Sequence, residues 1–358
     1  MRQAVADRLL FGLAASAMLT ILASAPEAQE LKPFNFMSAN NSSCGPFPQM
    51  NAEVLGFWAE EGIRVNLLSS ETTIPYVAFL ENGDADLAML DPPQVLQAVD
   101  NDVPVKLVYE AYQFAPEGIV VTEESPIKSL ADLKDATIGM ASDRDLITTV
   151  IAVESIGKTL DEMNIRTVVV GDSGPVMAGA LRDNTIQAFA GGSSDRAGIE
   201  AAGVKIRNIT PAEVSRNPGN NFVVWGPTLE EKRPLITAFL RGWAKAQLAG
   251  PLDTKLTAAA CRTRIPEQFE NLQTGLNLIN ANVYGMQLRR TKDFGELQPD
   301  VWKAIQPPYV KLKEISRAFD PATFLDPSFI EAANDFTTED VKAKINAWKE
   351  ANRDKLIN

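Results

Sequence analysis

Two short stretches combine residue types that bind small ligands, and each directly follows an apolar run. They contain Ser142, Asp143, Arg144, Ser193, Ser194, Asp195 and Arg196. An arginine donates paired hydrogen bonds to a carboxylate or sulfonate, which a helix cap does not require. We therefore expect one of the two arginines to contact a ligand, although pairing of Arg144 with a neighbouring aspartate explains that residue equally well. The serines and aspartates are also ordinary helix caps.

Other polar candidates precede two predicted helices nearer the N-terminus. Ser42, Ser43 and Cys44, in the loop NSSCGPFP, offer hydroxyl donors and a soft sulfur contact to a ligand. The alternative is a plain polar turn, because serine and glycine are common turn residues. Asp91 can accept a hydrogen bond from a ligand amine or hydroxyl, but the prolines that follow it favour a helix N-cap.

Two aromatic residues lie where we expect the chain to cross between two lobes of the folded protein. Tyr112 and Trp225 can stack on a flat or apolar ligand, and packing at a hinge is the slightly favoured alternative. Trp58 and Trp243 differ, because they lie on apolar stripes with helical spacing. We expect them in the core.

The chain contains no histidine among its 358 residues. Histidine is the commonest general base and metal ligand, so catalysis by Ser-His-Asp or Cys-His groups is excluded. Carboxylate or lysine chemistry remains open. We expect a protein that is not an enzyme and that needs no cofactor and no metal.

Apolar runs and helical patterns alternate with short connections through residue 227. Predicted strands cover 33–39, 63–68, 86–90, 105–112, 118–124, 137–141, 166–171, 188–192 and 222–227. Predicted helices separate most of them, including one in SPIKSLADLKD. This alternation indicates an α/β fold with parallel-type sheets flanked by helices. Beyond Pro227 the pattern becomes mostly helical, which predicts a helical C-terminal extension.

One helix–turn–strand pattern occurs twice in the chain. VAFLENGDADLAML begins at Val77, and MAGALRDNTIQAFAGG repeats its spacing 101 residues later, so that Leu80 aligns with Leu181. The repeat predicts two similar lobes. Ligands bind at the carboxyl ends of parallel strands, and a cleft between two lobes can close over a small molecule.

The N-terminal residues indicate the cellular compartment of the protein, and its net charge limits the classes of partner. A basic start is followed by an uncharged run from Leu9 to Ala25 with small residues at its end, as in a secretory signal peptide. The net charge of −12 argues against nucleic-acid binding. The two cysteines, Cys44 and Cys261, would meet an oxidising compartment after export, but sequence alone leaves their pairing open.

Four stretches in order resemble one known family. They are GFWAEEGIRVNL, AFLENGDADLAMLDPPQVL, PVKLV and SPIKSLADLKDATIGM. The chain resembles periplasmic solute-binding proteins of ABC importers, in the branch that binds sulfonates, taurine, nitrate and thiamine-pyrimidine precursors. The resemblance covers about residues 34–248, and the length beyond it is unexplained.

The resemblance implies a two-lobed α/β fold of the periplasmic-binding-protein type (type II). We expect a signal peptide at 1–28, lobe one at 29–114, lobe two at 115–222, and a return to lobe one with C-terminal helices at 223–358. It also implies a periplasmic monomer that captures a small-molecule ligand and docks on membrane permease and ATPase subunits. No nucleic acid is expected.

Alternatives remain open both for the class of ligand and for the biological role of the protein. Helix N-termini with Arg144 or Arg196 favour a sulfonate- or carboxylate-bearing ligand, and the aspartates with Tyr112 and Trp225 support a nitrogenous heteroaromatic one. A chemoreceptor-linked binding protein would share these features. An enzyme resembling thiamine-pyrimidine synthases is disfavoured, because that resemblance implies a histidine and a cysteine-rich motif.

Overall fold

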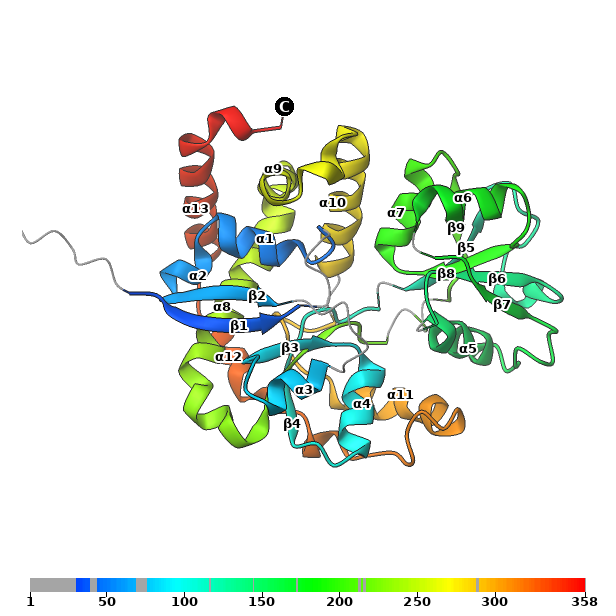
Figure 1. The fold of residues 1–358 in the computed structure, drawn as a ribbon, viewed down its shortest axis with the longest axis horizontal. Coiled ribbons are helices and arrows are strands. Elements are labelled where there is room, and N and C mark those ends of the chain that lie inside the picture. Colours follow the sequence, from blue (N-terminus) through cyan, green and yellow to red (C-terminus); the bar gives the residue numbers. More distant parts are fainter. Residues whose placement is uncertain are drawn as a thin grey trace, which may run out of the picture. The chain divides into compact units, whose positions relative to one another are not determined.

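The computed structural model describes residues 30–38, 44–68, 76–115, 117–143, 145–171, 173–211, 214, 217–287 and 290–357. The expected signal peptide at 1–28 lies outside these residues. From Leu31 onward the chain forms one compact unit. Its described strands form two five-stranded sheets, which can be followed in Figure 1.

The first sheet is built mainly from the N-terminal part of the chain, in the order β2-β1-β3-β10-β4. Its strands are β1 (Lys32–Met37), β2 (Ile63–Leu68), β3 (Leu87–Leu90), β4 (Val105–Glu110) and β10 (Asn221–Trp225). Helices α1 (Phe47–Val54), α2 (Phe57–Glu60), α3 (Tyr76–Glu81) and α4 (Pro92–Asp100) alternate with them. β1 pairs in parallel with β2 and β3, whereas β10 runs antiparallel to β3 and β4.

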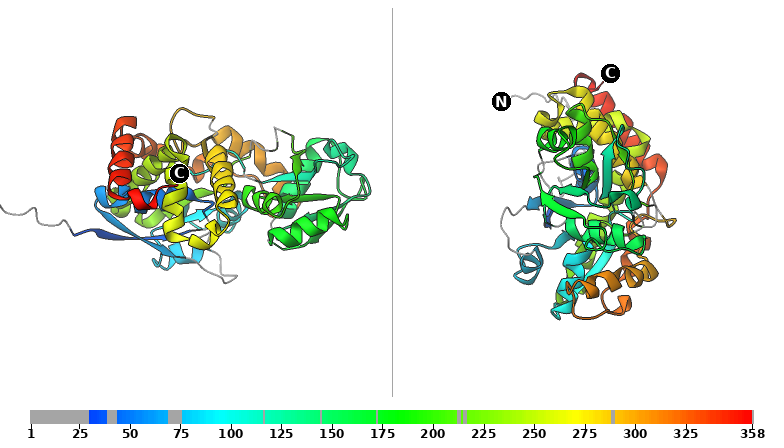
Figure 2. Two further views of the ribbon diagram at one scale, coloured as in Figure 1. Left: turned by 90° about the horizontal axis from the view of Figure 1, so that it is seen from above. Right: turned by 90° about the vertical axis from the view of Figure 1, so that its right-hand side faces the viewer.

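The second sheet lies between these segments in sequence and has the order β7-β6-β8-β5-β9. Its strands are β5 (Gly118–Thr122), β6 (Thr137–Met140), β7 (Arg166–Val169), β8 (Ala188–Gly191) and β9 (Ile206–Asn208). Its helices are α5 (Asp145–Ser155), α6 (Gly174–Arg182) and α7 (Ser193–Ala201). α5 contributes to one apolar cluster on this sheet, while α6 and α7 contribute to another. Figure 2 shows the sheet and its helices, coloured cyan-green to green, from two further directions.

The two sheets have the same topology, strand for strand. β3 and β8 are the central strands, and each follows the helix–turn that the repeated sequence pattern predicts. The turns match in backbone conformation, because Gly83 and Asn184 both have positive φ, at 76° and 55°. Glycine and asparagine are the residues that adopt this conformation most readily. The prediction of two similar α/β lobes is therefore confirmed.

Each sheet has the expected parallel pairs and also contains one strand that runs antiparallel to its neighbours. β5 runs antiparallel to β8 and β9, as β10 does to its own neighbours. The two antiparallel strands are the first strands that the chain forms after each crossover. A chain that arrives from the other sheet enters at the edge of the sheet where the crossovers lie. It therefore runs opposite to the strands whose carboxyl ends point toward that edge.

The second crossover lies earlier than expected. The sequence places it near Trp225, with lobe two ending at 222, but residues 221–225 form β10 itself. The two crossing segments instead pair with each other: Ala115 N–H donates to Asn217 O at 2.7 Å, and Gly219 N–H donates to Tyr112 O at 2.9 Å. The helix predicted in SPIKSLADLKD is also reduced, to the single 3-10 turn Leu130–Leu133.

The C-terminal extension is helical, as predicted, and packs on the first sheet. It comprises α8 (Leu229–Leu252), α9 (Thr254–Arg264), α10 (Leu272–Gln287), α11 (Pro299–Lys311), α12 (Ile330–Ala333) and α13 (Thr338–Ala351). Trp243 and Phe239 of α8 join an aromatic cluster with Phe222 of β10. Trp58 stacks on Phe239, so the expectation of core tryptophans holds.

Polar contacts of Glu110 and Gln113 attach the segment that follows α10 to the first crossover. The carboxylate of Glu110 accepts from Gln298 N, Gln298 Nε2 and Trp302 Nε1 at 2.8–2.9 Å. Gln113 Nε2 donates to Thr291 Oγ1 at 2.7 Å. Burial raises the pKa of Glu110, although its hydrogen bonds oppose the shift. These contacts fix where α11 begins.

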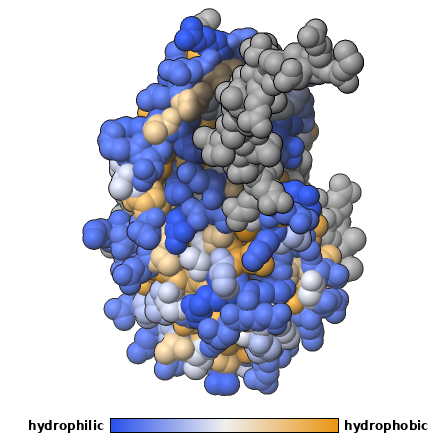
Figure 3. All heavy atoms as spheres, turned by 90° about the vertical axis from the view of Figure 1, so that its left-hand side faces the viewer, coloured by the Kyte–Doolittle hydropathy of each residue, from blue (hydrophilic) through white to orange (hydrophobic). Residues whose placement is uncertain are grey.

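Cys44 and Cys261 form a disulfide with a Cα–Cα distance of 6.0 Å, which answers the pairing that the sequence left open. It joins the start of α1 to α9. No helix in the described part of the chain is both long and apolar enough to cross a bilayer. Hydrophilic side chains cover most of the described surface on the face shown in Figure 3.

Candidate functional site

Two cavities meet at the first crossover between the sheets. Cavity one has a volume of about 390 Å³ and cavity two about 100 Å³. Ala115 and Glu117, just before β5, line both of them. A ligand in either cavity would therefore contact the segment that links the two sheets.

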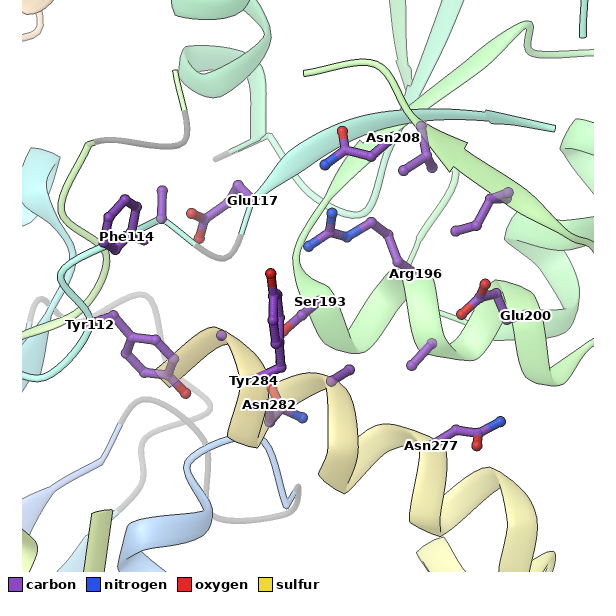
Figure 4. A pocket seen from close by; sticks show the side chains of 16 residues that line it. Tyr112, Phe114, Glu117, Ser193, Arg196, Glu200, Asn208, Asn277, Asn282 and Tyr284 are labelled. Carbon is purple, nitrogen blue, oxygen red and sulfur yellow. Dashed lines mark hydrogen bonds between the residues drawn. The ribbon is translucent and has the colours of Figure 1, made fainter. Parts of the chain in front are cut away.

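Cavity one is bounded by the first crossover, the second sheet with α7, and α10 (Figure 4). Its lining includes Tyr112, Glu117, Ser193, Arg196, Asn282 and Tyr284. Ser193 Oγ donates to Asn282 Oδ1 at 3.0 Å, which joins the first turn of α7 to α10. Most of the wall is apolar, with aromatic surface from Phe114 and two tyrosines, and charged and amide side chains stand within it.

Glu117 is the central ionisable group of the site. Its pKa is raised to about 7, first by burial and then by the nearby carboxylates of Asp91 and Asp145, while Arg196 lowers it. At neutral pH its carboxyl group is therefore close to half protonated. When protonated, such a group can donate a hydrogen bond; when ionised, it can accept a hydrogen bond or neutralise a cation.

Arg196 lies one turn into α7 and points toward Glu117 (Figure 4). Its Nη1 lies so near β5 that a Cβ added at Gly118 would be only 3.2 Å away. Burial lowers the pKa of its guanidinium, and the carboxylates of Glu117, Asp195 and Glu200 raise it. The arginine remains charged and is surrounded by acidic groups.

Cavity two is acidic. Asp91, Glu117 and Asp145 line it together with Tyr309 of α11. Asp91 is the N-cap of α4, in a capping box with Gln94. Asp145 opens α5 and accepts from Ser142 N–H at 2.8 Å. Burial is the largest cause that raises the pKa of the Tyr309 hydroxyl, and the negative charges of Asp91 and Glu117 also raise it.

The predicted residues divide into those on the cavities and those elsewhere. Tyr112, Ser193 and Arg196 line cavity one, and Asp91 lines cavity two. Tyr112 donates from its hydroxyl to Gly45 O at 3.3 Å, and burial raises the pKa of that hydroxyl. Ser42, Ser43 and Arg144 lie outside the described residues.

Four other predicted residues bond to nearby groups at helix starts or face solvent. Ser142 bonds to the carboxylate of Asp145, and Asp195 accepts from Gly192 N–H at 2.8 Å. Asp143 is exposed beside α5 and lines a separate groove, and Ser194 is exposed.

Two predicted contacts are corrected by the structure. Cys44 is fully buried and its sulfur is bonded to Cys261, so it offers no soft contact to a ligand. Trp225 pairs with Val105 at the far end of β10 and packs on an apolar cluster of the first sheet. It is separated from the crossover by the length of its strand, because β10 begins at Asn221.

Sequence reasoning missed Glu117, Asp145, Tyr309 and the contribution of α10. Glu117 had a weak signal, as a single acidic residue between Pro116 and Gly118 in a predicted crossover. The only signal in α10 was its richness in asparagine. Among the described residues, no group of three or more His, Cys, Asp or Glu side chains is arranged to hold a metal ion.

Comparison with known proteins gives a family and a fold. The family model described as NMT1/THI5 like matches residues 47–249, more than half of the chain. A search of curated proteins finds no match.

Solved structures share the fold at low sequence identity. The periplasmic aliphatic sulphonate-binding protein SsuA of Escherichia coli is similar with a TM-score of 0.65 and 14% identity, over 81% of this chain and 96% of that one. The periplasmic nitrate-binding protein NrtA of Synechocystis PCC 6803 gives 0.56 and 14%, over 93% and 92%. The desulfurization enzyme DszB gives 0.56 and 14%, over 88% and 99%. Binding proteins and an enzyme thus share this fold.

Proposed function

Because the chain belongs to the NMT1/THI5-like family, we propose that it is the substrate-binding component of an ABC importer. It is exported to the periplasm, captures a small polar organic molecule between its two sheets, and delivers it to permease subunits served by an ATPase. The proposal is supported by the likeness to sulphonate- and nitrate-binding periplasmic proteins. The paired sheets are joined by a first crossover that lines both cavities and a second that lines cavity two, and this arrangement supports capture by closure.

The observation that carries the ligand assignment is the acidic surrounding of Glu117. Asp91 and Asp145 stand at the starts of α4 and α5, and Asp195 stands in the first turn of α7. A carboxylate at a helix N-terminus offsets the positive end of the helix dipole, so these termini no longer attract an anion. We therefore assign a nitrogenous ligand, planar and bearing N–H or cationic groups, in preference to the sulfonate or carboxylate that the sequence favoured.

An anionic ligand is the second candidate, and Arg196 favours it. The guanidinium points into cavity one and is the group best suited to a sulfonate or carboxylate. Protonation of Glu117 would relieve its repulsion of such a ligand. The two ligand classes therefore predict opposite effects of pH on affinity.

We expect capture without turnover. The chain has no histidine, and its two cysteines are joined in the disulfide, so neither offers a thiolate nucleophile. The likeness to DszB makes the test necessary. A ligand recovered with unchanged mass after long incubation agrees with binding, and conversion of the ligand contradicts it.

A thermal-shift screen of the mature chain tests the proposal. It should include aminopyrimidines, amidines and amines alongside sulfonates, carboxylates and nitrate. A ligand at one hundred times its dissociation constant adds about 2.7 kcal/mol to the free energy of unfolding. Hits are then titrated against Glu117→Gln and Arg196→Ala. Loss of affinity in the first variant alone supports a nitrogenous ligand, loss in the second alone supports an anion, and unaltered affinity in both contradicts the site.

A further inference from the structure

Helix α10 lies beyond residues 47–249, the part of the chain that the family model matches, yet it forms one wall of cavity one. It contributes Asn277, Ala281, Asn282, Tyr284 and Gly285 to the lining. The helix packs against α7 of the second sheet as well as against α8 and α9. The cavity is therefore completed by a segment specific to the C-terminal extension.

Two contacts fix α10 against its surroundings. Gln247 Nε2 of α8 donates to Met286 O at 3.2 Å, near the end of α10. Ser193 Oγ donates to Asn282 Oδ1 at 3.0 Å, and Asn282 is buried. The second contact comes from the first turn of α7, whose next turn carries Arg196. The hydrogen bond thus sets α10 against the helix that presents the arginine.

Tyr284 is the most exposed of the large hydrophobic residues in the described chain, with 62% of its surface accessible. Its ring nevertheless lines cavity one, and its hydroxyl is directed toward the space between Glu117 and Arg196 (Figure 4). A single exposed aromatic residue on a convex surface needs no explanation. Here the ring lies in a concave site among charged and amide groups, where a planar ligand can cover it.

We propose that α10 is a specificity-determining wall of the ligand site and that Tyr284 stacks on a planar, unsaturated part of the captured molecule. This inference rests on the proposed binding function. Aromatic stacking and contact of a cation with a ring face both favour an unsaturated or cationic ligand over a saturated neutral one of the same size. Arg196 and Glu117 then contact the polar substituents of that ligand.

Matched probes of equal size but different planarity test the inference. We would titrate benzamidine against cyclohexanecarboxamidine, and benzenesulfonate against cyclohexanesulfonate, by calorimetry. The wild-type protein should bind the planar member of at least one pair on the order of tenfold more tightly. Tyr284→Ala should abolish that preference, whereas Tyr284→Phe should keep it, because the ring and not the hydroxyl stacks.

Asn280→Ala is the control, since Asn280 is exposed on α10 and does not line the cavity. It should behave as the wild-type protein does. A wild-type protein without preference for either planar probe overturns the inference, and so does a preference that survives in Tyr284→Ala. Failure of the binding function itself looks different, because then no compound of the broader screen binds in a manner that depends on Glu117 or Arg196.

Discussion

Asp86 and Gln187 accept equivalent hydrogen bonds, one in each sheet, although they are 101 residues apart. Asp86 Oδ2 accepts from Asn35 N–H at 2.7 Å, and Gln187 Oε1 accepts from Thr137 N–H at 2.8 Å. Each bond fixes the turn before a central strand to the neighbouring parallel strand. The repeated structure thus extends from backbone topology to a side-chain contact.

Removing this acceptor should destabilise the second sheet. Gln187→Ala leaves a part-buried N–H without its partner, and we expect a loss of about 1–3 kcal/mol in the free energy of unfolding. Urea denaturation measures the change. Gln187→Glu is the matched control, because it keeps an acceptor oxygen at the same position. Equal stability of the alanine variant and the wild-type protein would contradict this role.

The disulfide between Cys44 and Cys261 closes a loop with a sequence separation of 217. Cross-linking so long a loop restricts the unfolded chain, and a native disulfide of this kind contributes about 2–4 kcal/mol. We expect dithiothreitol to lower the melting temperature of the wild-type protein. The double variant Cys44→Ser, Cys261→Ser should melt at the lower temperature with or without reductant. A wild-type protein whose melting is unaffected after complete reduction would refute the prediction.

Gly295 is required where the extension contacts β4. It has φ of 74°, and an added Cβ would lie 2.1 Å from Cδ2 of Tyr109. Gly295→Ala should therefore lower the free energy of unfolding by about 3 kcal/mol or more. Gly179→Ala, in the open middle of α6, should instead raise it by about 0.5–1 kcal/mol. Similar effects of both substitutions in a denaturation experiment would mean that the close contact is absent.

Stability should depend on pH through Glu117. The pKa of its carboxyl group is raised to about 7 in the folded protein from an ordinary value of 4.5, so the folded state holds its proton more strongly than the unfolded state does. Stability from this group is fully present below pH 4.5 and declines as pH rises toward 7. The charged and titratable groups facing Glu117 are Asp91, Asp145, Arg196 and the two tyrosines Tyr112 and Tyr309.

Urea denaturation at pH 5 and pH 8 measures this dependence. Glu117→Gln cannot ionise, so its stability should fall less than that of the wild-type protein between the two values. Parallel changes in the two proteins would show that Glu117 titrates outside this interval.

Most of the fold follows from local patterns in the chain. The helix–turn–strand repeat, with Gly83 and Asn184 at its turns, predicted two similar lobes because it depends only on neighbouring residues. The direction of β10 and the position of the second crossover could not be obtained in the same way. They depend on which sheet the chain enters and on the pairing of Ala115 with Asn217, which are distant in sequence.

The candidate site was predictable only in part. Asp91, Ser193 and Arg196 follow predicted strands, so their place at a strand end could be inferred. The raised pKa of Glu117 could not, because it comes first from burial in the folded chain and then from Asp91 and Asp145, which approach it from separate helices. The apolar stripe of α10 indicates its buried face but does not reveal that Tyr284, on another face, meets a cavity.

The central claim is that a ligand binds at Glu117 between the two sheets. Calorimetric titration near pH 7, in two buffers of different ionisation enthalpy, measures the protons exchanged on binding. A cationic nitrogenous ligand should bind once per chain and release up to about half a proton, because Glu117 with a pKa of about 7 is half protonated there. Glu117→Gln should show no such release. Binding with the same proton exchange in both proteins would contradict the account.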